Sequence, residues 1–383
     1  SGSRPCPASR PAPAARTGHA QATRRHRGVG RVSRNPDCRP LGHGRSPEPV
    51  RSSDHVPSWL TGRGGGGLGD RAFRWLTLAA GLLVLAVLAL ILVFTVKEAW
   101  PAFRHEGIWG FLTGDRWVPN DPDGPDGPER PRYGALAFIY GTIVTSLIAV
   151  TIAVPISVGI ALFLTEYAPR RLRGPAVTII DLLAAVPSVV FGLWAILVLG
   201  PWLVDAYQAT HGLVGALPIL GSLFGPPQGP RAFMTAGIIV AIMIIPIITS
   251  ITREVFATVP SADKQAALAL GATRWEMIRG AVFPHSFGGV VGAVMLGLGR
   301  AMGETIAVSL TVGAATQITA NLFASGNTLP ARIVQNWGDP GIPPGRSALV
   351  GLGVVLFVIT VIVNYLARLV VRRAEIRMRG AAA

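Results

Sequence analysis

Two charged residues, Arg300 and Glu304, interrupt an otherwise apolar segment at residues 286–312. They are four positions apart, so a helix would place both on one face. An arginine near the centre of a membrane span costs roughly 2.5–3.5 kcal/mol on insertion scales, and intramembrane charges commonly mark a transport path or a partner chain. A guanidinium also presents planar, permanently charged donors that match the oxygens of an oxyanion. The pair predicts an anion path in which Glu304 moderates the attraction; a salt bridge that only fixes helix register is the alternative.

A second unusual stretch lies between two apolar segments, at residues 259–285. It reads VPSADKQAALALGATRWEMIRGAVFPH. Ser261 is expected to cap a first helix and Thr273 a second, with Gly271 breaking the chain between them and Pro284 ending the second helix. Two short helices joined at a glycine form a knob that can seat in a groove of another protein. An ordinary amphipathic connector fits the pattern equally well.

The composition indicates the class of protein in which the charged pair and the 259–285 stretch occur. Half of the 383 residues are apolar and only 14% are charged, against roughly 25% in an ordinary soluble domain. A formal charge of +15 accompanies a mean hydropathy of +0.46, a combination untypical of a soluble basic protein. A typical cytosolic enzyme and a fully disordered chain are therefore excluded, and a polytopic membrane protein is favoured.

Six segments are long and apolar enough to cross a hydrocarbon layer of ~30 Å as helices. Their continuous apolar character argues against alternating strands, and backbone groups in lipid must be satisfied within each helix. The sequence therefore predicts an all-α membrane protein. The expected spans are about 75–96, 134–164, 176–204, 232–252, 286–312 and 347–370.

Basic residues are distributed unevenly between the predicted loops. An even number of spans places the N-terminal tail, the loops after the second and fourth spans and the C-terminus on one side. That side carries 26 basic residues against eight on the other. The positive-inside rule then predicts that both termini are cytoplasmic.

Residues 1–70 form a basic tail rich in Pro, Gly, Ala and Ser, and residues 1–74 hold 14 Arg against four acidic residues. Too few large apolar side chains are present to offset ordering entropy, so this cytoplasmic tail is expected to be disordered. Such a tail could contact anionic lipid or nucleic acid. A solvated extension is the favoured interpretation, and no nucleic-acid partner is expected.

Metal chemistry is not expected of this chain. Both cysteines, Cys6 and Cys38, lie in the tail, so no thiolate site can form in the apolar body. His285 has no second ligand at a suitable spacing.

The 259–285 stretch resembles the "EAA" coupling loop of ABC importer permeases. Gln265, Ala266 and Ala267 match its opening element, with Gln in place of Glu, Gly271 is in register, and Pro284 matches the proline of its closing element. In that family the knob docks on an ATP-binding subunit and transmits ATP-driven closure to the membrane helices. The resemblance thus favours a coupling role over a plain connector.

Four further stretches extend the resemblance to about residues 75–375. They are similar to phosphate-specific ABC transporter permeases of the PstC type. The stretches are LGLGRAMGETIAV at 296–308, PSVVFG at 187–192, YGTIVTSLIAVTIAVPISVGIALFLTEYAP at 140–169 and KEAWPAF at 97–103.

The resemblance implies a fold and a function. Residues 71–383 should form a permease domain of the ABC importer (MetI-like) fold in the inner membrane, in contact with lipid. Arg300 and Glu304 should line the phosphate pathway. Asp181 is an acid often present in the family and could contact a gate or the knob, although interfacial exposure is slightly favoured; Pro187 could kink a span for alternating access.

The resemblance also implies partners. These are a homologous PstA-like permease, a dimer of ATP-binding subunits and an extracytoplasmic phosphate-binding protein. No G-x-x-x-x-G-K-[ST] phosphate loop occurs in the sequence, so ATP and Mg²⁺ should be bound by the partner ATPase and this chain should bind no cofactor and be no enzyme. A permease for another oxyanion, a self-sufficient anion channel or carrier, and a membrane scaffold of a phosphate-sensing complex remain alternatives.

Overall fold

A computed structural model describes residues 69–118, 132–338 and 345–381. The chain divides into two compact units, Ser1–Arg71 and Ala72–Ala383. Nearly all of the first unit, which contains the predicted basic tail and both cysteines, lies outside the described residues. The fold and the sites below belong to the second unit.

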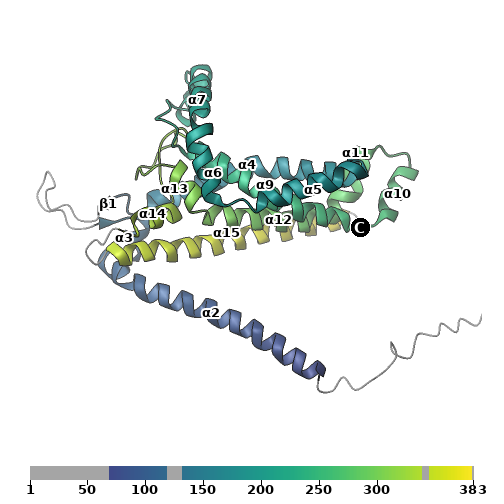
Figure 1. The fold of residues 1–383 in the computed structure, drawn as a ribbon, viewed down its shortest axis with the longest axis horizontal. Helices are drawn as coiled ribbons and strands as arrows, with labels where there is room; N and C mark the ends of the chain where they lie inside the picture. Colours follow the sequence, from purple (N-terminus) through teal and green to yellow (C-terminus); the bar gives the residue numbers. More distant parts are fainter. Residues whose placement is uncertain (1–68, 119–131, 339–344, 382–383) are drawn as a thin grey trace, which may run out of the picture. The chain divides into compact units, whose positions relative to one another are not determined.

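The regular secondary structure of the described residues is helical apart from one short hairpin (Figure 1). Strands β1 (Trp117–Val118) and β2 (Arg132–Tyr133) pair antiparallel, with Trp117 opposite Tyr133. The helices are α2 (Gly69–Glu106), α3 (Ile108–Thr113), α4 (Leu136–Leu162), α5 (Arg170–Ala184), α6 (Ser188–Trp194), α7 (Gly200–Val214), α8 (Pro218–Leu223), α9 (Phe233–Ala257), α10 (Ser261–Ala269), α11 (Arg274–Met277), α12 (Phe283–Gly303), α13 (Ile306–Thr311), α14 (Leu329–Asn336) and α15 (Gly345–Ala381). Three π-helical turns join some of them: η1 (Phe163–Tyr167), η2 (Ala195–Leu199) and η3 (Ile278–Val282).

Six helical stretches have the length and apolar character of membrane spans, which confirms the predicted all-α fold with six spans. The stretches are Gly69–Glu106, Leu136–Tyr167, Ser188–Val214, Phe233–Ala257, Arg274–Gly303 and Gly345–Arg373. The fourth of them, α9, is 61% buried over its most apolar window, more than any other described span. Helices α4, α12 and α5 pack directly against it.

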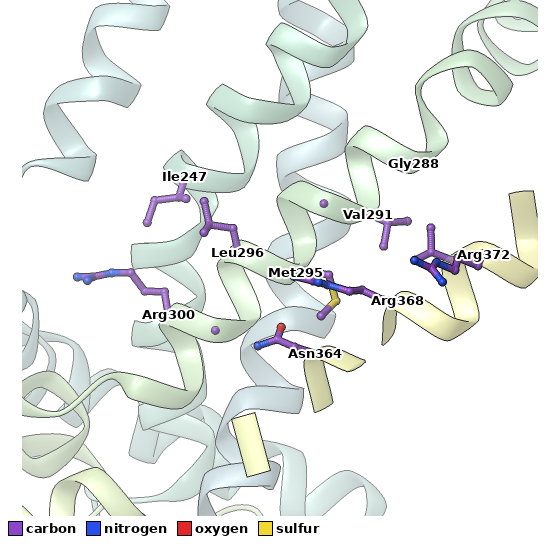
Figure 2. Close-up of a pocket in the computed structure, with 12 residues that line it drawn as sticks. Ile247, Gly288, Val291, Met295, Leu296, Arg300, Asn364, Arg368 and Arg372 are labelled. Carbon is purple, nitrogen blue, oxygen red and sulfur yellow. The ribbon is translucent and has the colours of Figure 1, made fainter. Parts of the chain in front are cut away.

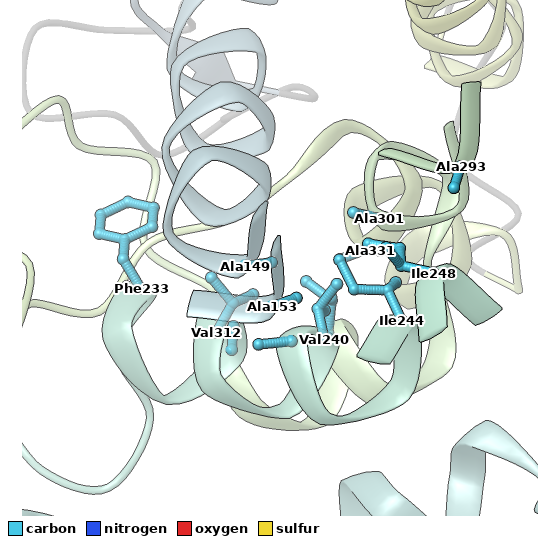
Figure 3. Packing of buried hydrophobic residues seen from close by; sticks show 13 residues of the cluster. Ala149, Ala153, Phe233, Val240, Ile244, Ile248, Ala293, Ala301, Val312 and Ala331 are labelled. Carbon is cyan, nitrogen blue, oxygen red and sulfur yellow. The ribbon is translucent and has the colours of Figure 1, made fainter. Parts of the chain in front are cut away.

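Small side chains allow α9 to approach α4 and α12 closely (Figure 3). Ala149 and Ala153 of α4 and Ala293 of α12 are fully buried against Ile244 and Ile248 of α9. Gly237 of α9 is equally tight, since an added Cβ would lie 2.5 Å from Ile148 of α4. Close backbone approach at small residues is the usual basis of helix association in lipid, where the hydrophobic effect between helices is weak.

A second, aromatic core joins the hairpin to the start of α15. Trp117 packs edge-on against Tyr133 and Phe138, with ring centroids 5.1 and 5.3 Å apart, and Leu352 of α15 is fully buried in the same cluster. This core fixes the end of the second unit that lies farthest along the spans from α10 (Figure 1).

Two span boundaries differ from the predicted ones. The third span was expected over 176–204, but α5 ends at Ala184 and the apolar span runs over Ser188–Val214. Pro187 causes the break because it disfavours helical geometry in the residue before it and then serves as the N-cap of α6. The fifth span was expected over 286–312, but it begins at Arg274, ends at Gly303 and is followed by the separate helix α13.

Candidate anion path and coupling segment

Arg300 lies in the last turn of α12, next to the point where this helix ends. The helix ends at Gly303, and Glu304 caps it in an extended conformation (φ −68°, ψ 126°) before α13 begins at Ile306. The last carbonyl groups of a helix have no intrahelical partners and carry partial negative charge, which stabilises a nearby guanidinium. The sequence placed Arg300 in the middle of a continuous span; the structure places it where that span ends.

Arg300 and Glu304 face one another, as their spacing predicts. Arg300 Nη2 lies 3.6 Å from Glu304 Oε2, a distance of an ion pair rather than of a good hydrogen bond. The Glu304 side chain is 6% exposed, whereas that of Arg300 is 48% exposed. The carboxylate thus partly neutralises the arginine from behind, and guanidinium N–H groups stay accessible to an anion.

Arg300 lies at one end of a groove of about 830 Å³ between α12 and α15, and its guanidinium points away from Asn364 and Arg368 (Figure 2). The groove is lined by Ile247, Gly288, Val291, Gly292, Met295, Leu296, Gly299, Arg300, Asn364, Arg368, Val371 and Arg372. An added Cβ at Gly292 or Gly299 would meet no atom within 4 Å, so these glycines leave open space on this face of α12. Arg300 is therefore open to solute. The volume of the groove lies in the range of small-ligand sites.

Asp181 and Pro187 lie outside this groove. Asp181 is an exposed residue of α5 that shares a narrow crevice with Thr249 and Arg253 of α9. Pro187 is exposed at the break before α6. Neither residue lines the groove that holds Arg300.

The segment 259–285 forms the two predicted short helices, α10 and α11. Gly271 separates the two helices and has φ +85°, a conformation that favours glycine. Thr273 caps α11 in a capping box: Glu276 N donates to Thr273 Oγ1 at 3.3 Å, and Thr273 N donates to Glu276 Oε2 at 2.7 Å. The sequence predicted this cap and this break.

Two details of that segment differ from expectation. Ser261 is the first residue of α10 rather than its cap, and its side chain makes no capping hydrogen bond. Pro284 does not end the second helix, because α11 continues through η3 into α12 as one stretch from Arg274 to Gly303. Pro284 lies in the first turn of α12, and the wider π turn before it accommodates a residue without an N–H donor.

The tip of this segment presents apolar side chains to solvent. Gln265, Ala266 and Gly271 are exposed, and Leu270 and Trp275 are 89% and 60% exposed. Ala267 is half-buried and packs on a cluster that includes Phe256 and Met277. An exposed apolar tip on a buried base is typical of a surface that another protein covers.

Two contacts that the sequence analysis missed anchor the segment to the end of the second span. Lys264 Nζ lies 2.6 Å from Glu166 Oε1, with side chains only 20% and 10% exposed, and the Arg274 guanidinium lies 5.7 Å from the centre of the Tyr167 ring. Both partners belong to η1. A signal was available: Glu166 is an acid at the end of the second span, on the side where an even-span topology places this loop.

Replacing Lys264 with methionine should reduce transport by about fivefold, because a partly buried ion pair of this kind contributes roughly 1 kcal/mol. The measurement is substrate uptake per chain in vesicles, with Arg279→Met as the control, since Arg279 is an exposed base of η3 without an ion-pair partner among the described residues. The charge-swapped pair Lys264→Glu/Glu166→Lys should recover uptake. Equal uptake by Lys264→Met and the control would show that the pair does not matter.

Comparisons with known proteins identify the family of this chain. A family profile described as binding-protein-dependent transport system inner membrane component matches residues 153–376. A Mesorhizobium japonicum protein named phosphate transport system permease protein PstC is 42% identical over 81% of this chain and 92% of its own length. Proteins of that name from Xylella fastidiosa (strain 9a5c) and Haemophilus influenzae are 43% and 41% identical, covering 76% and 80% of this chain and 89% and 94% of theirs.

Solved structures support the fold. A chain of a bacterial ABC transporter involved in the import of the acidic polysaccharide alginate matches with a TM-score of 0.52 and 14% identity, over 80% of this chain and 98% of that one. At this identity the likeness concerns the fold alone. The family profile, the PstC relatives and the six spans lead to the same conclusion. The chain belongs to the binding-protein-dependent transport system inner membrane components and, within them, to the PstC family of phosphate transport system permeases.

Proposed function

We propose that this chain is the transmembrane permease subunit of an ATP-driven importer of inorganic phosphate. The observation that carries the proposal is the accessible guanidinium of Arg300, held at a span's end with Glu304 behind it and open to a groove between two spans. The relatives named phosphate transport system permease support phosphate over another oxyanion.

The energy for transport comes from a separate ATP-binding subunit. The sequence lacks the Walker A phosphate loop, so ATP and Mg²⁺ bind to that partner and this chain carries no cofactor of its own. The exposed tip of the coupling segment, with Leu270 and Trp275, is where the ATPase docks. Gln265, Ala266 and Ala267 of α10 lie beside that contact.

The remaining partners complete the pathway. A homologous PstA-like permease pairs with this chain, two ATP-binding subunits form a dimer below them, and an extracytoplasmic phosphate-binding protein delivers the substrate. Both termini and the coupling segment lie in the cytoplasm of a cell whose inner membrane holds the spans, as the distribution of basic residues favours.

The coupling segment and Arg300 share one continuous helical stretch. Arg274 to Gly303 is 30 residues, or ~45 Å at 1.5 Å per residue. Movement of α10 is transmitted to η1 through the Lys264–Glu166 pair and to Arg300 through η3 and α12. A chain of packed, rigid elements of this kind can carry energetic coupling between distant sites. ATP-driven closure of the partner thus changes which side of the membrane reaches Arg300.

Reconstitution tests the proposed function directly. The complete importer in vesicles should take up labelled phosphate only when ATP and the phosphate-binding protein are supplied, and excess unlabelled sulfate should compete poorly. Uptake by this chain without any ATPase subunit would instead support a self-sufficient anion channel or carrier. Absence of uptake by the complete importer, with transport of a different oxyanion, would reassign the substrate.

A further inference from the structure

The groove that begins at Arg300 contains a second cluster of donors at its other end. Figure 2 shows Arg300 at one end and Arg372 at the other, with Asn364 and Arg368 between them. Asn364, Arg368 and Arg372 follow one another at intervals of four on α15, so they lie on one face of that helix. This face is turned toward the glycine-containing face of α12.

The part of the groove around these arginines is basic. None of the residues that line the groove is acidic, so no carboxylate faces Arg368 and Arg372 from its walls. Two like charges four residues apart on a helix repel each other. An anion bound between them would offset that repulsion and would accept hydrogen bonds from two guanidinium groups and the Asn364 amide.

Basic residues are generally common at the cytoplasmic ends of membrane helices, but that preference does not require them to line a groove. Arg373 lies at the same end of α15 and does not line the groove, whereas Arg368 and Arg372 do. The groove also stays open at Gly292 and Gly299, where longer apolar side chains would occupy it. The groove that contains Arg300 therefore also offers open space, two positive charges and an amide donor.

We propose that Asn364, Arg368 and Arg372 form a second phosphate-binding station, which receives the anion after Arg300 and releases it on the side of the coupling segment. The station rests on the proposed function and adds a step to it. Arg300 and Gly288, which mark the two ends of the groove on α12, are twelve residues apart, a path of ~18 Å. An anion leaving Arg300 would otherwise cross that distance through an apolar groove, so the pair of guanidiniums at Arg368 and Arg372 lowers the barrier to exit.

Uptake by the reconstituted importer provides the first test. Arg368→Gln/Arg372→Gln should lower ATP-dependent phosphate uptake about tenfold, because two charge-assisted contacts are lost. Arg373→Gln removes a charge from the same helix end outside the groove and should transport like the wild type. Equal uptake by the double variant and Arg373→Gln, with the wild type active, would overturn the station and leave the proposed function standing. An inactive wild type would instead count against the proposed function.

The phosphoryl group of an anionic lipid has the same chemistry, and vesicle composition separates the two sources. In pure phosphatidylcholine vesicles the defect of Arg368→Gln/Arg372→Gln should persist, because the ligand is the transported phosphate. Loss of that defect in phosphatidylcholine, with its return when phosphatidylglycerol is added, would show that the groove holds a lipid headgroup and would overturn the station.

A cysteine reporter detects occupancy directly. Val291 lines the groove near Arg372 (Figure 2), and with Cys6 and Cys38 replaced by serine, Val291→Cys is the only thiol in the chain. Inorganic phosphate should slow its reaction with a methanethiosulfonate reagent in the complete importer, and Arg368→Gln/Arg372→Gln should abolish the slowing. Equal slowing with and without the two arginines would overturn the station.

Discussion

Replacing Arg300 with glutamine is expected to lower ATP-dependent phosphate uptake by about 100-fold or more. Each hydrogen bond to a charged group contributes roughly 1.5–3 kcal/mol, and 1.4 kcal/mol corresponds to a factor of ten. Glutamine keeps a polar side chain at the end of α12 but loses the charge and most of the donors that remain accessible beside Glu304. The measurement is initial uptake of labelled phosphate by the reconstituted importer.

The controls for Arg300→Gln separate transport from assembly. Removal of a charge from a span should ease insertion, so the amount of chain in the membrane and its association with the partner subunits should be unchanged. Arg300→Lys should transport at an intermediate rate, because an ammonium keeps the charge but lacks the planar pair of donors. Near-normal uptake by Arg300→Gln would remove Arg300 from the pathway.

Replacing Gly271 with proline is expected to uncouple ATP hydrolysis from transport, so that phosphate moved per ATP falls at least about tenfold. Gly271 has φ +85°, and its N–H donates to the carbonyl of Leu268 at 3.0 Å. Proline fixes φ near −65° and has no N–H, so it breaks the turn that sets α10 against α11. The measurement is the ratio of phosphate uptake to ATP hydrolysis in the same vesicles.

A matched series at Gly271 shows whether backbone conformation is the cause. Gly271→Asn should transport nearly normally, since asparagine tolerates the left-handed region, and Gly271→Ala should be intermediate. An added Cβ at this position meets no atom within 4 Å, so crowding within the chain does not confound the series. An unchanged ratio for Gly271→Pro would show that force does not enter through this segment.

Much of the fold could be predicted because its signals are local in sequence. Continuous apolar runs give the six spans, and the positive φ at Gly271 and the capping box at Thr273 follow from residue types known to favour them. The pairing of Arg300 with Glu304 follows from their spacing. These features depend on neighbours within a few residues, so tertiary packing does not change them.

The features that could not be predicted depend on contacts between distant segments or on small differences in backbone geometry. The chain from Gly303 to Ile306 contains no proline, yet α12 ends there. The π turn η3 keeps Pro284 inside a continuous span, against the usual behaviour of proline. The Lys264–Glu166 pair joins residues 98 positions apart, and the groove needs the register of α15 against α12.

The central claim is that the Arg300 guanidinium binds phosphate during transport, and a cysteine one turn before it tests this directly. Leu296 is 57% exposed and lines the same groove, so Leu296→Cys, with Cys6 and Cys38 replaced by serine, reports occupancy beside Arg300. In the complete importer during ATP hydrolysis, phosphate should slow methanethiosulfonate modification of this thiol, and Arg300→Gln should remove the effect. A modification rate that phosphate leaves unchanged, or slows equally with and without Arg300, would contradict the account.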